Sequence, residues 1–227
     1  MKIDCTLKDA VSPWLKNSFP QIKKYTDHCE KTKIKRGTVL ISPGERSSIL
    51  FYVLKGKLKV SLVHIDGQEK MLSLIGQGSM IYEGSMFTNN ISPVLVTALE
   101  NCELAYLNDV KIKELMEKDL QFSYELLNYI YLKYKQLVFL HQGVLFSSPS
   151  QRFCRLICVL SDTFGEKHED KRIVNLGFTQ AQLAELLGVS RVTVSTILKD
   201  MRQKNIITTK NRSLIFDNKI CTYCQSN

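Results

Sequence analysis

TQAQLAELLGVSRVTVSTILKDM, residues 179–201, carries the start signals of two short helices separated by a glycine. Thr179 is followed three residues later by Gln182, which is the capping-box pattern in front of an apolar run. Gly188 can adopt the left-handed conformation of a tight turn, and Ser190 is a typical cap for a second helix. Two capped helices that meet at one glycine form the pattern of a helix-turn-helix, which predicts that the chain reads DNA.

The second of these helices separates apolar from polar side chains. Apolar residues at spacings of three and four predict one buried face, made by Val194, Ile197, Leu198 and Met201. The other face is polar and basic, which suits base edges and phosphates. An ordinary helical hairpin with a solvated face has the same periodicity, so the periodicity alone leaves both interpretations open.

Charge favours the DNA interpretation. The chain has 31 Lys and Arg against 22 Asp and Glu, and its net charge of +9 favours a polyanionic partner, either nucleic acid or an acidic membrane surface. Seven basic and two acidic residues lie between positions 186 and 219, so more than half of the net charge lies on the predicted DNA reader.

Apolar runs and cysteines bear on the compartment. The N-terminus has no sustained apolar core, and nowhere do about 18 apolar residues run together, so we expect a cytoplasmic protein with no membrane partner. The seven cysteines are scattered, which predicts reduced thiols and not a disulfide framework. Cys154 and Cys158 lie among apolar residues and are expected in a helix core. Cys221 and Cys224 form a CxxC that leaves metal binding or a reversible disulfide open.

Residues 33–107 consist of short alternating runs broken by turn residues, which predicts an all-β roll or barrel. Asp66-Gly67 predicts a hairpin with a two-residue turn and positive φ at both positions.

A helical pattern follows, with a short segment at 110–118 and a longer one behind it. The longer segment has a heptad seam that predicts pairing with the same helix of a second subunit in a two-fold dimer. The predicted seam consists of Leu127, Ile130, Tyr134, Leu137, His141 and Val144. Tyr131, Val138 and Leu145 form a second apolar line, which is expected to pack against the β-roll of the same chain.

Ser148 and Pro149 have the residue types of a helix cap and a first helical position, so a new helix is expected there, ending near 164–165. Residues 166–172 are expected to form a surface loop, 173–178 a strand, and 206–216 a hairpin with its turn near Asn211. These elements predict a winged helix-turn-helix.

In this order, the parts resemble the cyclic-AMP receptor protein and fumarate-nitrate reductase regulator (CRP/FNR) family of bacterial transcription factors over nearly the whole chain. The resemblance rests on KRGTVLISPGERSSILFYVLKGKLKV, GQGSMIYEGSMF and VTALENCELAYL, followed by the seam helix and the winged helix-turn-helix. It implies an α+β fold with a cyclic-nucleotide-binding-like β-roll at 1–108, a linker and dimerisation helix at 109–147, and a winged helix-turn-helix at 148–227. It also implies a homodimer, a small-molecule effector, a double-stranded DNA operator and RNA polymerase as partners.

The resemblance assigns roles to residues of the DNA-binding domain. Arg191 matches a guanine-reading arginine, Ser190, Thr193 and Thr179 match phosphate contacts, and Lys210 and Arg212 lie where the wing touches backbone. Val192 and Thr196 depart from the family pattern of glutamate and arginine and can place methyl groups against thymine, so we predict A/T-rich half-sites one helical turn apart. The full predicted DNA-binding set is Arg191, Val192, Thr193, Ser195, Thr196, Ser190, Thr179, Lys199, Lys210 and Arg212.

The effector implied by the resemblance is not cyclic AMP. Glu83 lies where cyclic-nucleotide members hold the ribose, but Ser92 and Pro93 replace the phosphate-binding arginine and its neighbour, and Leu137 and Val138 replace the two hydroxyls that hold adenine. No cofactor is expected. Cys5 and Cys29 lack the clustered spacing of iron-sulfur ligands, and the pocket helix offers no cysteine or histidine to haem.

The chain most resembles the branch that controls reductive dehalogenation, whose members bind chlorinated phenols. In that branch, a lysine at the position of Lys133 meets the phenolate, while a second pocket lysine is replaced here by Glu83, which disfavours an anion and leaves an uncharged aromatic equally open. Tyr129, Tyr131 and Tyr134 offer aromatic faces, although packing at the seam would also explain them. The predicted effector-binding set is Tyr82, Glu83, Gly84, Ser85, Ile130, Lys133, Tyr134 and Leu137.

Three other classes of protein share single features with this sequence. A cupin-like metal enzyme needs paired histidines on one strand, and His28, His64, His141 and His168 are isolated, so no metal site and no enzyme are expected. A cyclic-nucleotide-binding regulatory subunit has no need for a basic helix-turn-helix. A regulator of the same family that responds to redox through cysteine thiols stays open.

Overall fold

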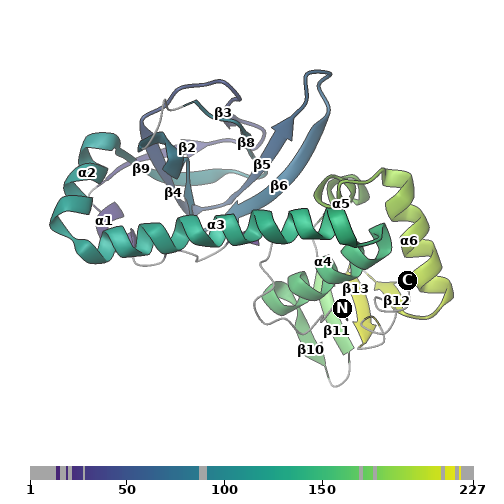
Figure 1. Cartoon of the computed structure of the whole chain (residues 1–227). Helices are drawn as coiled ribbons and strands as arrows, with labels where there is room; N and C mark the ends of the chain where they lie inside the picture. Colours follow the sequence, from purple (N-terminus) through teal and green to yellow (C-terminus); the bar gives the residue numbers. More distant parts are fainter. Residues whose placement is uncertain are drawn as a thin grey trace. The chain divides into compact units, whose positions relative to one another are not determined.

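The computed structural model describes residues 14–15, 19, 22–27, 29–86, 91–168, 171–175, 178–210, 213–217 and 220, and the chain divides into two compact units (Figure 1). An N-terminal unit comprises residues 13–134, and a C-terminal unit begins at Lys135. The division lies inside the long helix α3 (Leu120–Phe146), which contributes to both units. The predicted domain limits at 108 and 147 fall instead at the ends of elements, and they remain predictions.

The N-terminal unit is a roll of two β-sheets. The five-stranded sheet has the order β1 (Trp14–Leu15), β6 (Glu69–Gly76), β5 (Lys57–Val63), β8 (Leu95–Ala98), β3 (Val39–Ile41). The four-stranded sheet has the order β2 (Glu30–Ile34), β9 (Cys102–Asn108), β4 (Ile49–Lys55), β7 (Met80–Ile81). Every pairing is antiparallel except that of β1 with β6. The predicted α+β fold with an N-terminal β-roll is therefore confirmed.

The interior of the roll is built from the inward side chains of both sheets. Because successive side chains of a strand point to opposite faces, alternate apolar residues of each strand reach this interior. It consists of Ile41, Val53, Leu58, Val60, Ile75, Ile81, Val96, Ala98, Cys102 and Leu104.

The hairpin between β5 and β6 differs from its prediction. The strands end at Val63 and begin again at Glu69, and of the two predicted turn residues Gly67 alone has positive φ, at +85°. The Gly67 amide donates to the His64 carbonyl at 2.9 Å, and the His64 amide donates to the Gln68 carbonyl at 2.8 Å. The predicted two-residue turn is wrong because a longer connection needs only one left-handed residue.

Helices α1 (Lys23–Thr26), α2 (Asp109–Lys118) and α3 cover the outer face of the four-stranded sheet (Figure 1). The α3 residues in this second core are Phe122, Leu126 and Tyr129. The predicted packing of Tyr131 on the roll is wrong, because its side chain is 59% exposed. Val138 and Leu145 belong to the C-terminal unit, and their packing on the roll remains a prediction. All three apolar lines have heptad spacing, and spacing alone does not say which one meets the sheet.

The C-terminal unit combines three helices with a four-stranded antiparallel sheet. Its helices are α4 (Pro149–Phe164), α5 (Gln180–Leu187) and α6 (Arg191–Gln203). Its strands, in sheet order, are β10 (Glu166–His168), β11 (Lys171–Asn175), β13 (Ser213–Asp217) and β12 (Ile207–Lys210). Ser148 caps α4 in a capping box with Gln151, and Pro149 opens the helix, as predicted.

Two details of this unit correct the sequence analysis. The run at 166–172 contains β10 and the start of β11 and is not a loop throughout, because backbone pairing with a neighbouring strand does not need apolar side chains. The predicted strand at 173–178 starts earlier, at Lys171, and ends at Asn175. The predicted turn near Asn211 lies outside the described residues. None of the helices in the described ranges is long and apolar enough to cross a membrane.

Candidate functional site

The helix-turn-helix has the caps that its sequence predicted. The Gln182 amide donates to the Thr179 hydroxyl at 3.2 Å, and the Thr179 amide donates back to the Gln182 side chain at 2.9 Å. Gly188 has φ +64°, in the left-handed region. The Thr193 amide donates to the Ser190 hydroxyl at 3.0 Å, so both helices are capped by side chains.

Helix α6 has one buried and one exposed face. Val194, Ile197, Leu198 and Met201 are all buried, as predicted. Of the predicted DNA contacts in the described chain, Thr193 is half-buried and the others are exposed: Thr179, Ser190, Arg191, Val192, Ser195, Thr196, Lys199 and Lys210. Arg212 lies outside the described residues.

The start of α6 presents apolar groups beside the arginine. Val192, the second residue of the helix, is 74% exposed. The Thr196 hydroxyl donates to the Val192 carbonyl at 3.0 Å. Because the hydroxyl hydrogen is used in this bond within the helix, the methyl group of Thr196 is the part of the side chain left to contact a partner.

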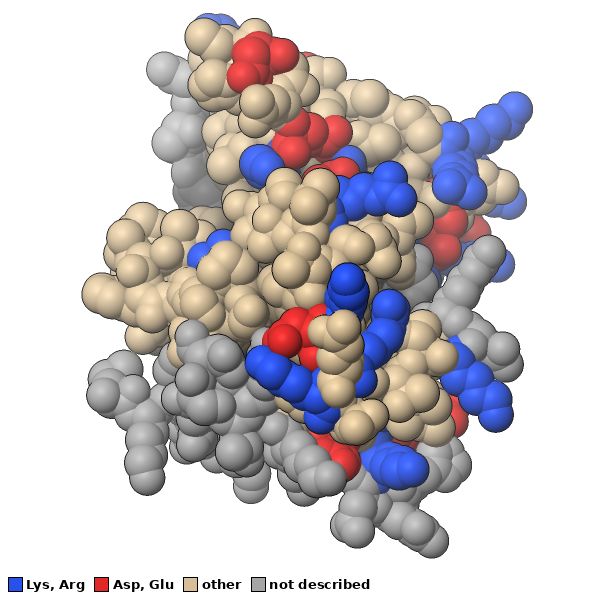
Figure 2. Space-filling model, turned by 90° about the vertical axis from the view of Figure 1, so that its right-hand side faces the viewer, with Lys and Arg blue, Asp and Glu red and all other residues tan. Residues whose placement is uncertain are grey.

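Basic side chains gather around α6, on the side of the molecule that Figure 2 views. The Lys204 ammonium pairs with Asp200 at 3.0 Å, and the Arg202 Nε donates to the Thr209 hydroxyl of β12 at 3.2 Å. Arg191 and Lys199 form no ion pair with any described residue and remain available to a partner. Sequence reasoning did not find the Arg202–Thr209 bond, because the pairing between helix and wing is a tertiary contact.

In the N-terminal unit, Lys133 of α3 and Glu83 of the 3-10 helix η2 (Glu83–Met86) form an ion pair. The Lys133 Nζ lies 2.7 Å from the Glu83 Oε2, and the side chains are only 22% and 15% exposed. The same Nζ lies 5.1 Å from the centre of the Tyr129 ring, within reach of a cation–π interaction. Two predicted effector residues that are 50 positions apart are thus brought together.

Tyr129 is a structural residue of this region. Its hydroxyl accepts a hydrogen bond from the Met80 amide at 3.0 Å and donates one to the Met80 carbonyl at 2.5 Å. Burial, followed by the nearby Glu83 carboxylate, raises the pKa of the Tyr129 phenol well above its ordinary value. Its ring packs in the second core and lies beside Lys133. Of the three tyrosines that the sequence offered to an effector, Tyr129, Tyr131 and Tyr134, Tyr129 is therefore the one that the roll holds in place.

Tyr82, directly before Glu83, has a strained backbone. Its φ is +71°, a conformation that costs a residue with a side chain about 1–3 kcal/mol. Its hydroxyl donates to the Glu45 carbonyl at 3.1 Å, which ties it to the loop after β3. No sequence signal identified this strain, because tyrosine is not a residue that predicts positive φ.

The other predicted effector residues are dispersed. Gly84 is exposed, and Tyr134 and Leu137 are 61% and 52% exposed. Ile130 is partly buried and packs against the second core, between α3 and the four-stranded sheet. The side chain of Ser85 is not described. Ser92 is buried, and its hydroxyl donates to the Val94 carbonyl at 2.9 Å, so it closes a turn where cyclic-nucleotide members have an arginine.

The exposed side of α3 is a continuous apolar stripe. Five of the six predicted seam residues are exposed, and Ile130 is the half-buried one. The line that was expected to meet the roll lies beside them, and the rings of Tyr131 and Tyr134 stack at 6.3 Å. The exposed apolar side chains along α3 are Leu120, Tyr124, Leu127, Tyr131, Tyr134, Leu137, Val138, Val144, Leu145 and Phe146.

The described cysteines are Cys29, Cys102, Cys154 and Cys158, and all are free thiols. Burial raises the pKa of the Cys29 and Cys102 thiols, which makes each a weaker nucleophile at neutral pH. Cys154 and Cys158 lie on the buried face of α4, as predicted. Cys5, Cys221 and Cys224 lie outside the described residues. Within the described ranges, no three His, Cys, Asp or Glu side chains are grouped to hold a metal ion.

Comparison with known proteins gives a consistent result. Residues 31–119 match the cyclic nucleotide-binding domain family, and residues 151–219 match the Crp-like helix-turn-helix domain family. The chain is 23% identical to the cAMP-activated global transcriptional regulator CRP of Salmonella typhimurium, over 86% of this chain and 93% of the relative. It is also 23% identical to the global nitrogen regulator of Nostoc sp., over 79% of this chain and 81% of the relative.

Solved structures share the fold. CprK complexed with OCPA has a TM-score of 0.79 at 22% identity, covering 94% of this chain and 98% of that one. A CooA mutant from Carboxydothermus hydrogenoformans has a TM-score of 0.78 at 18% identity, covering 88% and 90%. With a cyclic nucleotide-binding domain, a long helix and a Crp-like helix-turn-helix in this order, the chain belongs to the CRP/FNR family of transcription regulators.

Proposed function

We propose that the protein is an effector-controlled transcription regulator that binds a palindromic, A/T-rich operator as a homodimer and acts together with RNA polymerase. The observation that carries this proposal is the outer face of α6, where Arg191 stands exposed at the first helical position of a capped helix and forms no ion pair with any described residue. An arginine there can form two hydrogen bonds with one guanine.

The apolar stripe on α3 supports the homodimer. A stripe of this length, with the three- and four-residue spacing of a coiled coil, is unusual on the surface of a monomer. A second copy of the same helix covers such a stripe with matching side chains, and the resulting two-fold axis relates the two DNA-binding heads.

The neighbours of Arg191 support the base composition. Val192 has no hydrogen-bonding group, and the Thr196 hydroxyl already donates to the helix backbone. Both can place methyl groups against thymine, whereas neither offers the bidentate donor that reads guanine. The operator is therefore expected to have one guanine contact in each half-site within an A/T-rich sequence.

The effector is a small molecule other than cyclic AMP. The Glu83 carboxylate is already paired with the Lys133 ammonium, and the Ser92 hydroxyl carries no positive charge that could bind the phosphate of a cyclic nucleotide. A purely anionic ligand that took Lys133 would leave Glu83 unpaired in a half-buried site, which is costly. We therefore favour an aromatic ligand with an acidic oxygen for Lys133 and a hydrogen-bond donor for Glu83, within the branch that controls reductive dehalogenation.

Two experiments test these points separately. Selection of binding sites from a random DNA pool should return a palindrome with A/T-rich half-sites, and Arg191→Ala should lose the guanine in each; a G/C-rich consensus would exclude the proposed composition. Titration calorimetry should detect heat with hydroxylated or chlorinated aromatic acids and none with cyclic AMP. Lys133→Met is the matched control, and heat from cyclic AMP alone would refute the ligand class.

A further inference from the structure

Arg152 lies at the junction between the end of α3 and the helix-turn-helix. Its backbone is in the first turn of α4. Its Nη1 donates to the carbonyl of Ser147 at 3.0 Å, and its Nε donates to the carbonyl of Leu187 at 3.2 Å. Ser147 directly follows α3, and Leu187 is the last residue of α5. One guanidinium therefore bridges the ends of two helices.

Both carbonyls are natural partners for a cation. The last carbonyls of a helix have no donor within the helix and carry the negative end of its dipole. At the end of α5, the Gly188 amide donates a hydrogen bond to the Glu185 carbonyl, and the Val189 amide donates one to the Ala184 carbonyl. The Leu187 carbonyl is bonded by Arg152, directly before the left-handed turn that separates α5 from α6.

The stem of Arg152 is also placed by its surroundings. Gly143 of α3 is buried, and a Cβ there would lie 3.7 Å from the Arg152 Cδ, so the stem lies close over the α3 backbone. Arg155, three residues further along α4, has its guanidinium 4.9 Å from the Phe139 ring of α3. Two arginines on one side of α4 thus fasten this helix to the last turns of α3.

We propose that Arg152 is a positioning residue that fixes the angle between α3 and the helix-turn-helix, and thereby sets the half-site spacing that the dimer accepts. This inference rests on the proposed binding of two half-sites by a homodimer. Arg152 itself is not among the residues expected to touch DNA. Its planar fork bonds two carbonyls in one fixed geometry, whereas a lysine ammonium does not reproduce that geometry.

The test compares spacing tolerance and not affinity alone. The selected operator and versions with the half-sites moved by one or two base pairs are titrated with wild type, Arg152→Ala, Arg152→Lys and the control Lys171→Ala, which changes an exposed cation on β11. Wild type and the control should prefer one spacing by about tenfold or more, because half-site spacing follows protein geometry. For Arg152→Ala, the ratio between the affinities for the preferred spacing and for the shifted spacings should fall to about threefold or less. Arg152→Lys should give a ratio between those of wild type and Arg152→Ala.

Binding to a single isolated half-site separates positioning from folding. If Arg152 positions the head, Arg152→Ala should bind this half-site within about threefold of wild type. An unchanged spacing ratio, or an equal loss of affinity for every spacing and for the half-site, would overturn the inference. Failure of the wild type to bind any paired half-sites would refute the proposed function itself, which is a different result.

Discussion

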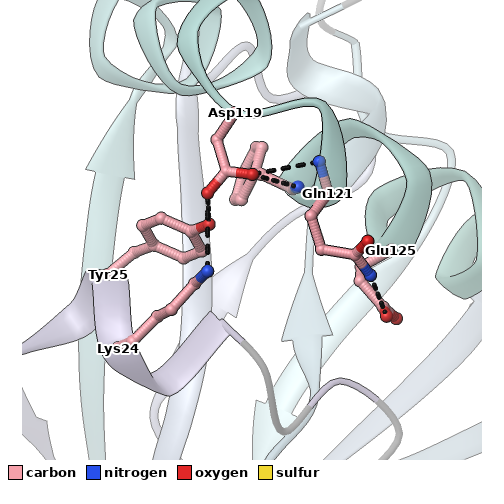
Figure 3. Close-up of polar contacts among 6 residues, drawn as sticks. Lys24, Tyr25, Asp119, Gln121 and Glu125 are labelled. Carbon is pink, nitrogen blue, oxygen red and sulfur yellow. Dashed lines mark hydrogen bonds and ion pairs between the residues drawn. The ribbon is translucent and has the colours of Figure 1, made fainter.

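The Tyr25 hydroxyl donates a hydrogen bond to the carboxylate of Asp119, although the two residues are 94 positions apart (Figure 3). The same carboxylate accepts the amides of Gln121 at 3.0 Å and Phe122 at 3.2 Å and pairs with Lys24 at 3.4 Å. The Tyr25 ring meets the Phe122 ring edge to face, with centres 5.1 Å apart. One carboxylate therefore caps the start of α3 and holds α1 against it.

This arrangement predicts a pH-dependent stability. The hydrogen bond from Tyr25 is the main cause that lowers the pKa of Asp119 from its ordinary value of 3.8. A carboxylate with a depressed pKa stabilises the fold above its ordinary pKa, and that stability is lost as the pH falls through the folded value. Asp119→Asn keeps a capping oxygen but no charge, so its melting temperature should lie below that of wild type at pH 7 and approach it under acid conditions. Thermal scans from pH 7 down to the acid limit measure this, with Glu117→Gln as the control; a constant gap would contradict it.

The Glu83–Lys133 pair predicts a non-additive pair of substitutions. Lys133→Met leaves a carboxylate unpaired in a half-buried site and should destabilise the protein by about 1–3 kcal/mol. Glu83→Gln together with Lys133→Met should recover much of that loss, because no charge is then left unpaired. Urea unfolding of the four proteins in a double-mutant cycle measures the coupling, and additive effects would show that the pair contributes nothing.

The stripe on α3 predicts that a charge placed on it separates the subunits. Leu127 is 62% exposed in the single chain, so Leu127→Arg should fold normally but run as a monomer in analytical ultracentrifugation. Asn128→Arg adds the same charge one position away, off the heptad line, and should remain dimeric. Equal association of both variants would show that the stripe is not the dimer interface.

Arg191 and Lys199 of α6, which form no ion pair with any described residue, are expected to differ in what their removal costs. Arg191→Ala should weaken operator binding by about 1–3 kcal/mol and relax the preference for guanine at one position. Lys199→Ala should weaken binding to all sequences alike and reduce the salt dependence by about one ion, as expected of a phosphate contact. Competition titrations at several salt concentrations distinguish the two. A loss of specificity in Lys199→Ala alone would reverse the assignment.

Local signals account for what the sequence predicts well. Thr179, Ser148 and Ser190 cap their helices with side chains only three residues away, so a short stretch of chain contains the whole interaction. The roll is likewise indicated by alternation within single strands. These features need no knowledge of the tertiary fold.

What the sequence does not reveal depends on contacts between distant residues. The choice of Phe122, Leu126 and Tyr129 as the inner face of α3 is made by the sheet they meet. The Glu83–Lys133 pair, whose members were both named as effector residues, was not foreseen as a pair. Arg152 had no signal at all, because its two partners are backbone carbonyls, which every residue has.

Helix α3 contains no proline between Leu120 and Phe146, and proline is a frequent cause of sharp kinks. Gly143 lies in the last turn of this helix, where a side chain larger than that of alanine would compete with the stem of Arg152 for space. A bulky residue at position 143 would therefore push the first turn of α4 away from the end of α3.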